Sequence, residues 1–161
     1  MRTRIYEILE NVCDPEVPVL SILDLGIVRD VLVEKEGVEV VITPTYSGCP
    51  AMNMIAMNIR IELAAVGFPN VKISEVLKPA WTTDWLTENG KRKLKEYGIA
   101  PPQYSSKKMR ENLDFGVENA IPCPLCDSLN TELISEFGST SCKSLHRCKD
   151  CLEPFDYFKC H

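Results

Sequence analysis

The sequence predicts an α+β fold in two parts, a small two-layer domain followed by a β domain of the zinc-ribbon type. Over residues 1–100, apolar residues recur at the spacings of helices and strands in the order α-β-β-α-β. Over residues 121–161, two Cys-x2-Cys pairs frame strand-like sequence. We therefore expect an α+β domain over 1–100, a linker over 101–120 and a zinc ribbon over 121–161.

The N-terminal segment reads as an amphipathic helix followed by turns. Residues 2–12 carry isoleucine, leucine and valine at helical spacing. Two prolines in 14–18 force an extended or turn conformation there. Residues 21–26 form a short turn that ends on Gly26.

The next segments complete a two-layer domain. Residues 27–33 and 38–43 are rich in β-branched residues and flank a polar turn with a glycine, which is typical of an antiparallel hairpin. Apolar residues at helical spacing predict a helix from about Pro50 that stops at Gly67. Residues 70–77 alternate like a third strand.

Two shorter helices are expected before the linker. Thr82 or Thr83 can cap a helix that runs through Leu86. Residues 91–97 predict a second helix, and residues 101–108 have the composition of a linker.

Six of the eight cysteines lie in the C-terminal part, where they favour a metal site. Each Cys-x2-Cys pair can form a tight knuckle, and two knuckles supply the tetrahedral thiolate set of a structural Zn²⁺ site. The expected ligands are Cys123, Cys126, Cys148 and Cys151. Strands are expected over 131–137 and 155–158, with residues 144–147 leading into the second knuckle.

Two alternatives to this zinc site remain open. The four cysteines could hold an iron–sulfur cluster, which also takes four thiolates. One ligand could instead be Cys142, Cys160, His146 or His161. A closed four-sulfur site has no open position for catalysis.

Cys49 is the candidate functional thiol of the first domain. It precedes a helix whose first position is expected to be Pro50, so its sulfur would face unpaired N–H groups and have a lowered pKa. Thr45 adds a hydroxyl beside it. The alternative is that Cys49 is a small, buried and inert side chain.

Other residues of the first domain are weaker candidates for a functional role. Asp14 and Glu16 are candidate hard ligands or general bases, although a solvated turn is the simpler interpretation. Residues 1–100 contain no histidine, so a Cys/His catalytic pair cannot form within them. Trp81 and Trp85 are candidates for core residues or interface anchors.

Composition narrows the function further. The net charge of −5 argues against broad binding of a nucleic-acid backbone. No apolar run is long enough for a transmembrane helix, and the N-terminus lacks the apolar core of a signal peptide. We therefore expect a cytoplasmic protein that binds neither membranes nor nucleic acid.

The first domain resembles the metal–sulfur cluster biosynthetic proteins, which include SufT-like factors. The matching segments are 14–16, 22–28 and 43–50. The segments 78–85, 97–102, 135–140 and 155–158 resemble the PaaD branch, also called the PaaJ subunit of phenylacetate-CoA oxygenase. Members of this branch are accessory subunits of the multicomponent ring-1,2-phenylacetyl-CoA epoxidase of aerobic phenylacetate degradation.

The resemblance implies a role in maturing the iron or iron–sulfur centres of that complex. The reactive cysteine of the family falls on Cys49, which would bind iron or a cluster transiently. The partners would be the oxygenase or reductase subunits, and a homodimer through the exposed sheet edge is a further expectation. A non-catalytic structural or regulatory subunit is the alternative. In that case the Trp81 and Trp85 surface and the ribbon would dock to the oxygenase.

Overall fold

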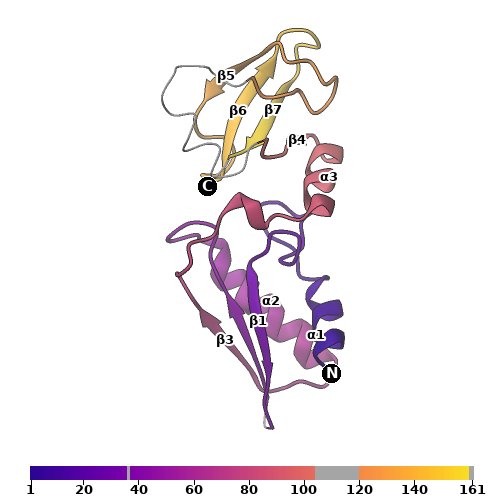
Figure 1. Ribbon diagram of the computed structural model, residues 1–161, viewed down its shortest axis with the longest axis vertical. Coiled ribbons are helices and arrows are strands. Elements are labelled where there is room, and N and C mark those ends of the chain that lie inside the picture. The colour runs from indigo at the N-terminus through magenta and orange to yellow at the C-terminus, as the bar shows by residue number, and fades with distance from the viewer. Residues whose placement is uncertain (36, 104–119, 160–161) are drawn as a thin grey trace. The chain divides into compact units, whose positions relative to one another are not determined.

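The computed structural model describes residues 1–35, 37–103 and 120–159 (Figure 1). They form two compact units, each described below by itself. The first comprises Met1–Trp81 and Trp85–Gly90, and the second comprises Thr82–Asp84 and the chain from Lys91 onward. The expected domain boundaries stay predictions, because most of the linker, residues 104–119, lies outside the described residues.

The first unit contains a three-stranded sheet in the order β1-β2-β3. Strands β1 (Val28–Val33) and β2 (Val38–Ile42) pair antiparallel, which confirms the predicted hairpin. Strand β3 (Val71–Glu75) pairs parallel with β2, so the helix between them is a crossover connection.

Two helices cover one face of this sheet (Figure 1). They are α1 (Arg2–Leu9) and α2 (Ala51–Ala65). Alternate residues of β2 are buried, as expected for a strand with one covered face. The side of α2 that faces the core carries Met52, Ile55, Ile59 and Leu63. This arrangement confirms the two-layer α-β-β-α-β prediction.

The stretch after β3 differs from the prediction of two helices. The expected helix from Thr82 or Thr83 is only a 3-10 turn, η1 (Thr83–Trp85). The following helix, α3 (Glu88–Glu96), starts before the predicted residue 91. Thr87 caps it, because its Oγ1 accepts the N–H of Gly90 at 2.9 Å.

A buried carboxylate connects the 21–26 turn to the start of α3. Asp24 is 3% exposed and accepts hydrogen bonds from Ser21 N–H at 3.3 Å, Thr87 Oγ1 at 3.0 Å and Asn89 Nδ2 at 3.1 Å. Gly26 sits in the same turn at φ +66°, and an added Cβ would lie 2.5 Å from the carbonyl oxygen of Trp85. Both residues therefore fix this turn in the first unit.

The second unit contains a four-stranded sheet in the order β4-β7-β6-β5. Strands β5 (Thr131–Ser135) and β7 (Pro154–Phe158) agree with the expected strands, and β6 (Lys143–Cys148) between them extends the segment expected to lead into the second knuckle. Strand β4 (Ile99–Ala100) pairs parallel with β7, a pairing that the sequence pattern does not predict. The fold class, an α+β domain with a C-terminal ribbon, is confirmed. No helix among the described residues is long and apolar enough to span a membrane.

Candidate functional site

The structure brings the four predicted cysteines of the second unit together. The sulfurs of Cys123, Cys126, Cys148 and Cys151 all lie within 4.8 Å of one another. Cys123 and Cys126 come from the turn before β5, and Cys148 and Cys151 come from the end of β6 and the turn after it. Two knuckles therefore face one point, as the spacing predicts.

The separations between these sulfurs fit one tetrahedral ion. The Sγ atoms of Cys123 and Cys151 are 3.7 Å apart, and those of Cys126 and Cys148 are 3.6 Å apart. A metal–sulfur bond of about 2.3 Å gives a tetrahedral edge of about 3.8 Å. In a cluster, thiolates on different iron atoms are separated by the width of the cluster, so the geometry favours a single ion.

The local backbone prepares one of these sulfurs for a cation. The N–H of Cys151 points at the Cys148 Sγ at 3.5 Å. This hydrogen bond makes the largest contribution to lowering the pKa of the Cys148 thiol to about 7; the backbone of Asp150 and the thiols of Cys126 and Cys151 lower it further, and burial opposes them. A thiolate at this position is the ionised form that a metal requires.

The alternative ligands have other contacts. The Cys142 sulfur lies 3.0 Å from Thr140 Oγ1, and His146 Nε2 lies 3.0 Å from Ser144 Oγ. His146 also stacks on Phe155, with ring centroids 5.6 Å apart. The group of four that could hold a metal contains neither residue. Cys160 and His161 lie outside the described residues.

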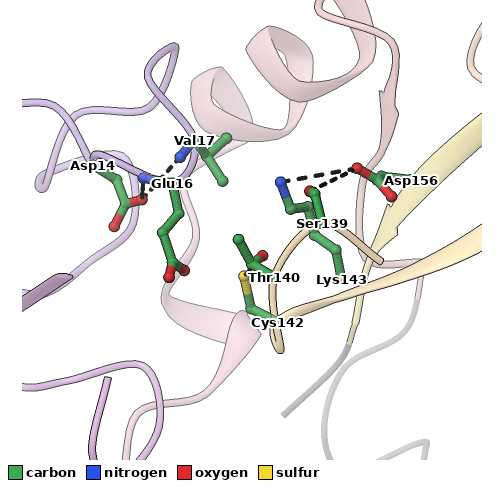
Figure 2. A network of polar contacts seen from close by, with 8 residues as sticks. All are labelled: Asp14, Glu16, Val17, Ser139, Thr140, Cys142, Lys143 and Asp156. Carbon is green, nitrogen blue, oxygen red and sulfur yellow. Dashed lines mark hydrogen bonds and ion pairs between the residues drawn. The ribbon is translucent and has the colours of Figure 1, made fainter. Parts of the chain in front are cut away.

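A partly buried ion pair stabilises the turn that carries Cys142. Asp156 accepts a hydrogen bond from Ser139 at 3.2 Å, and its carboxylate lies 3.9 Å from the Nζ of Lys143 (Figure 2). The Lys143 side chain is 6% exposed. An added Cβ on Gly138 would lie 2.5 Å from Asp156 Oδ1, so a larger residue there would require the Asp156 side chain to move. These contacts place Cys142 in a structural turn.

Cys49 lies next to the N-cap of helix α2, as expected, but the predicted position of Pro50 is wrong by one residue. Helix α2 begins at Ala51 with Pro50 as its N-cap, so Pro50 is not the first helical residue. The carbonyl of Cys49 still accepts the N–H of Met52 at 3.3 Å. The half-buried thiol is hydrogen-bonded by the backbone of Ala51 and by the side chains of Tyr46 and Thr45.

The expected lowering of the Cys49 pKa is wrong. Burial raises the pKa of this thiol, and the nearby charge of Glu16 raises it further. The hydrogen bonds from Ala51, Tyr46 and Thr45 act in the opposite direction but are outweighed. The thiol is therefore protonated at neutral pH, although these three hydrogen-bond donors would stabilise a thiolate if one formed.

Asp14 is a structural residue of the turn beside this thiol. It is 7% exposed, so the interpretation as a solvated turn is wrong for it. Figure 2 shows its Oδ1 accepting the N–H groups of Glu16 at 2.7 Å and Val17 at 2.9 Å. The Asp-Pro dipeptide at 14–15 is the sequence signal for such a side-chain turn. Asp14 thus shapes the turn that brings Glu16 near Cys49.

Cys13 and the two tryptophans also belong to the first unit. The Cys13 sulfur is exposed and lies 3.9 Å from the carbonyl of Asn11. Trp81 is 4% exposed and donates its indole N–H to the carbonyl of Leu25 at 2.8 Å, so of its two predicted roles, core residue and interface anchor, it has the first and does not form part of a docking surface. Trp85 is half-buried under the guanidinium of Arg29, which lies 3.8 Å from the ring centroid. The catalytic and ligand roles assigned to individual residues stay predictions.

Family models match both parts of the chain. The model described as an iron–sulfur cluster assembly protein matches residues 2–74, and the PaaD zinc beta ribbon domain matches residues 107–159. The first match contains Cys49, and the second contains all four ribbon cysteines.

Two curated relatives match different extents of the chain. An Escherichia coli K12 protein, described as a candidate component of 1,2-phenylacetyl-CoA epoxidase, is 48% identical over 97% of this chain and 91% of its own length. A Porphyromonas gingivalis protein described as an Fe-S protein maturation auxiliary factor is 36% identical over 56% of this chain and 87% of its own length. The second relative matches only part of this chain.

Solved structures resemble a little over half of the chain. A domain of unknown function, DUF59, from Bacillus anthracis matches with a TM-score of 0.54 and 26% identity, covering 58% of this chain and 90% of that structure. A conserved hypothetical protein from Thermotoga maritima matches with a TM-score of 0.50 and 26% identity, covering 58% of this chain and 93% of that structure.

Proposed function

Because the chain belongs to the PaaD family, we propose that it is an accessory component of a 1,2-phenylacetyl-CoA epoxidase that helps to mature the complex's iron or iron–sulfur centres. Two observations support this role. The relative with 48% identity is described as a component of this epoxidase, and an iron–sulfur assembly model covers residues 2–74. The partners are then the oxygenase or reductase subunits of the complex.

The observation that carries the proposal is the setting of the Cys49 sulfur. It lies at the start of α2, within hydrogen-bonding reach of Ala51, Tyr46 and Thr45. A free thiol needs no such set of donors, whereas a thiolate gains from each of them. Cys49 therefore holds an incoming iron ion or cluster as a thiolate and releases it to the partner protein.

In the proposed mechanism the thiol changes protonation when it takes its cargo. The raised pKa keeps Cys49 protonated and slow to oxidise when it is empty. When iron arrives, an iron–sulfur bond forms, the S–H bond breaks and the proton goes to solvent. Glu16 lies close enough to Cys49 to affect its charge and to attract the cation.

The ribbon is proposed to bind a second metal, which has a structural role. We assign a structural Zn²⁺ to Cys123, Cys126, Cys148 and Cys151, because their sulfur separations match the edges of a tetrahedron with zinc–sulfur bonds. When bound, this ion would contribute folding free energy to the ribbon and no chemistry of its own.

Metal and acid-labile sulfide analysis tests the proposal. Wild type and Cys49→Ser are purified with and without the partner subunits, and Cys13→Ser serves as the matched control. The proposal predicts zinc in every sample and iron in wild type and Cys13→Ser, with iron lost from Cys49→Ser. Equal iron in all three would reject Cys49 as the iron-handling residue.

A docking protein without metal chemistry is the second candidate. The ribbon exposes Leu125, Leu129, Leu133, Ile134, Phe137 and Leu152, and each of these side chains is at least half exposed. Exposed apolar residues in such number favour a protein-binding surface. This candidate predicts stable co-purification with the oxygenase and full tolerance of Cys49→Ser.

A further inference from the structure

Thr43 has a buried hydroxyl that no other group satisfies among the described residues. The residue is 1% exposed, and its Oγ1 has no hydrogen-bond partner in the part of the chain that the structure describes. Its backbone N–H, in contrast, is bonded to the carbonyl of Ile27 at 2.9 Å. A buried hydroxyl without a partner destabilises the fold, because it loses its bonds to water and gains none.

Packing alone does not explain a threonine at this position. The preceding strand β2 consists of Val38, Val40, Val41 and Ile42 with one glutamate, and Thr43 extends it by one residue. Valine has the same branched shape without the hydroxyl and suits an extended backbone as well. The hydroxyl therefore has a role that this arrangement of the chain does not show.

Thr43 is the first residue of the loop that presents Cys49. Residues 43–50 lie between β2 and α2 and belong to neither element. Gly48 adopts φ +79°, and an added Cβ there would meet nothing within 4 Å, so the loop has a pivot in open space next to the thiol. Thr45 and Tyr46 in the same loop already bond to the Cys49 sulfur, whereas the Thr43 hydroxyl does not.

We infer that Thr43 is a positioning residue that favours the iron-loaded arrangement of the 43–49 loop. Its hydroxyl has no partner among the described residues while Cys49 is a free thiol. It gains an acceptor within the loop when the iron–sulfur bond replaces the S–H bond and the proton leaves to solvent. The inference rests on the proposed function, and Thr43 acts through the loop rather than by touching the iron.

This role predicts how the effect of Thr43→Val on stability is related to its effect on iron affinity. Removing the unsatisfied hydroxyl stabilises the empty state, whereas in the loaded state it loses the hydrogen bond that the hydroxyl has gained. By linkage, the factor by which Thr43→Val weakens iron binding must be at least as large as the factor by which it raises the folding equilibrium constant. We expect that factor to be about five- to tenfold, typical of one unsatisfied hydroxyl.

The experiment compares the full-length wild type with Thr43→Val, Thr43→Ser and Cys49→Ser. All four are saturated with Zn²⁺ first, so that the ribbon cysteines are occupied. Urea unfolding gives the stability without iron, and anaerobic titration with Fe²⁺ against a competing chelator gives the affinity. Thr43→Val is expected to be more stable and to bind Fe²⁺ at least about five- to tenfold more weakly, whereas Thr43→Ser keeps the hydroxyl and with it the wild-type affinity for Fe²⁺.

Every other outcome contradicts either the role of Thr43 or the proposed function of Cys49. If Thr43→Val is stabilised but binds Fe²⁺ like wild type, the hydroxyl has no role in loading. If Thr43→Val is destabilised, the hydroxyl is satisfied in the empty protein and the inference is wrong. If Cys49→Ser binds Fe²⁺ as tightly as wild type, the proposed function itself fails, and the Thr43 inference fails with it.

Discussion

Cys49 illustrates how two opposing effects act on one thiol. The positive end of α2 and three hydrogen-bond donors favour the thiolate, but partial burial and the charge of Glu16 favour the thiol. The balance raises the pKa, so the residue differs from catalytic cysteines that are ionised at rest. A metal ion changes this balance because it replaces the proton directly.

The raised pKa predicts slow alkylation of Cys49 at neutral pH. A higher pKa means a smaller thiolate fraction at every pH below it, and only the thiolate reacts with iodoacetamide. The exposed Cys13 in the same unit is the internal comparison. Timed labelling at about pH 7.5, followed by peptide mass spectrometry, should show Cys49 reacting several-fold more slowly than Cys13, and its rate should increase as the pH is raised toward the pKa of the thiol. Faster labelling of Cys49 would show that its pKa is lowered.

At the scale of elements, Asp24 carries a stability prediction. Removing its carboxylate leaves three donors, from Ser21, Thr87 and Asn89, without their acceptor in a buried setting. Asp24→Ala should lower the free energy of unfolding by about 2–4 kcal/mol. Asp24→Asn keeps one acceptor oxygen and should lose less. The measurement is urea unfolding, with the exposed Glu75→Ala as a control that should change stability by less than about 0.5 kcal/mol. An equally small effect of Asp24→Ala would refute the role of this carboxylate.

The elements show which structural features local sequence can predict. The hairpin, α2 and the two knuckles follow from patterns within a few residues, so the sequence predicts their positions closely. Strand β4 has only two residues and exists because it pairs with β7, more than fifty positions along the chain. The burial of Trp81 likewise depends on the distant carbonyl of Leu25. Such features depend on tertiary pairing, which periodicity does not encode.

The sequence predicts which residues belong to the two candidate sites, but not how their surroundings shift the pKa of Cys49. The Cys-x2-Cys spacing identifies all four members of the metal-binding group. Residue type identifies Cys49, Thr45 and Glu16 as candidates, and the structure brings them together. The direction of the Cys49 pKa shift does not follow from the sequence because it depends on burial, which results from the packing of the whole unit. The burial of Asp14 within its turn escapes the sequence for the same reason.

At the scale of the whole molecule, the two units differ in how they are stabilised. The first unit has an extensive apolar core across β1, β2, α1 and α2. One core cluster of the ribbon consists of Ala100, Ile121, Cys123, Cys148, Phe155 and Tyr157, so two of its six members belong to the proposed metal site. Under this proposal, a core of this size depends on bound metal for its stability.

Metal removal should therefore unfold one unit and spare the other. After treatment with a strong chelator, amides of β5, β6 and β7 should lose protection from hydrogen exchange, whereas amides of β2 and α2 should keep it. Cys148→Ser should have the same selective effect without a chelator. Full protection of the ribbon strands after elemental analysis shows the metal to be gone would contradict this prediction.

The central claim is that Cys49 delivers iron or a cluster to a partner protein. The most direct test is the iron content and epoxidase activity of the complex purified from cells that co-express wild type, Cys13→Ser or Cys49→Ser with the partner subunits. We predict that Cys49→Ser remains folded and retains its zinc but yields a complex poor in iron and low in activity, while Cys13→Ser behaves like wild type. An iron-replete, fully active complex formed with Cys49→Ser would contradict the claim.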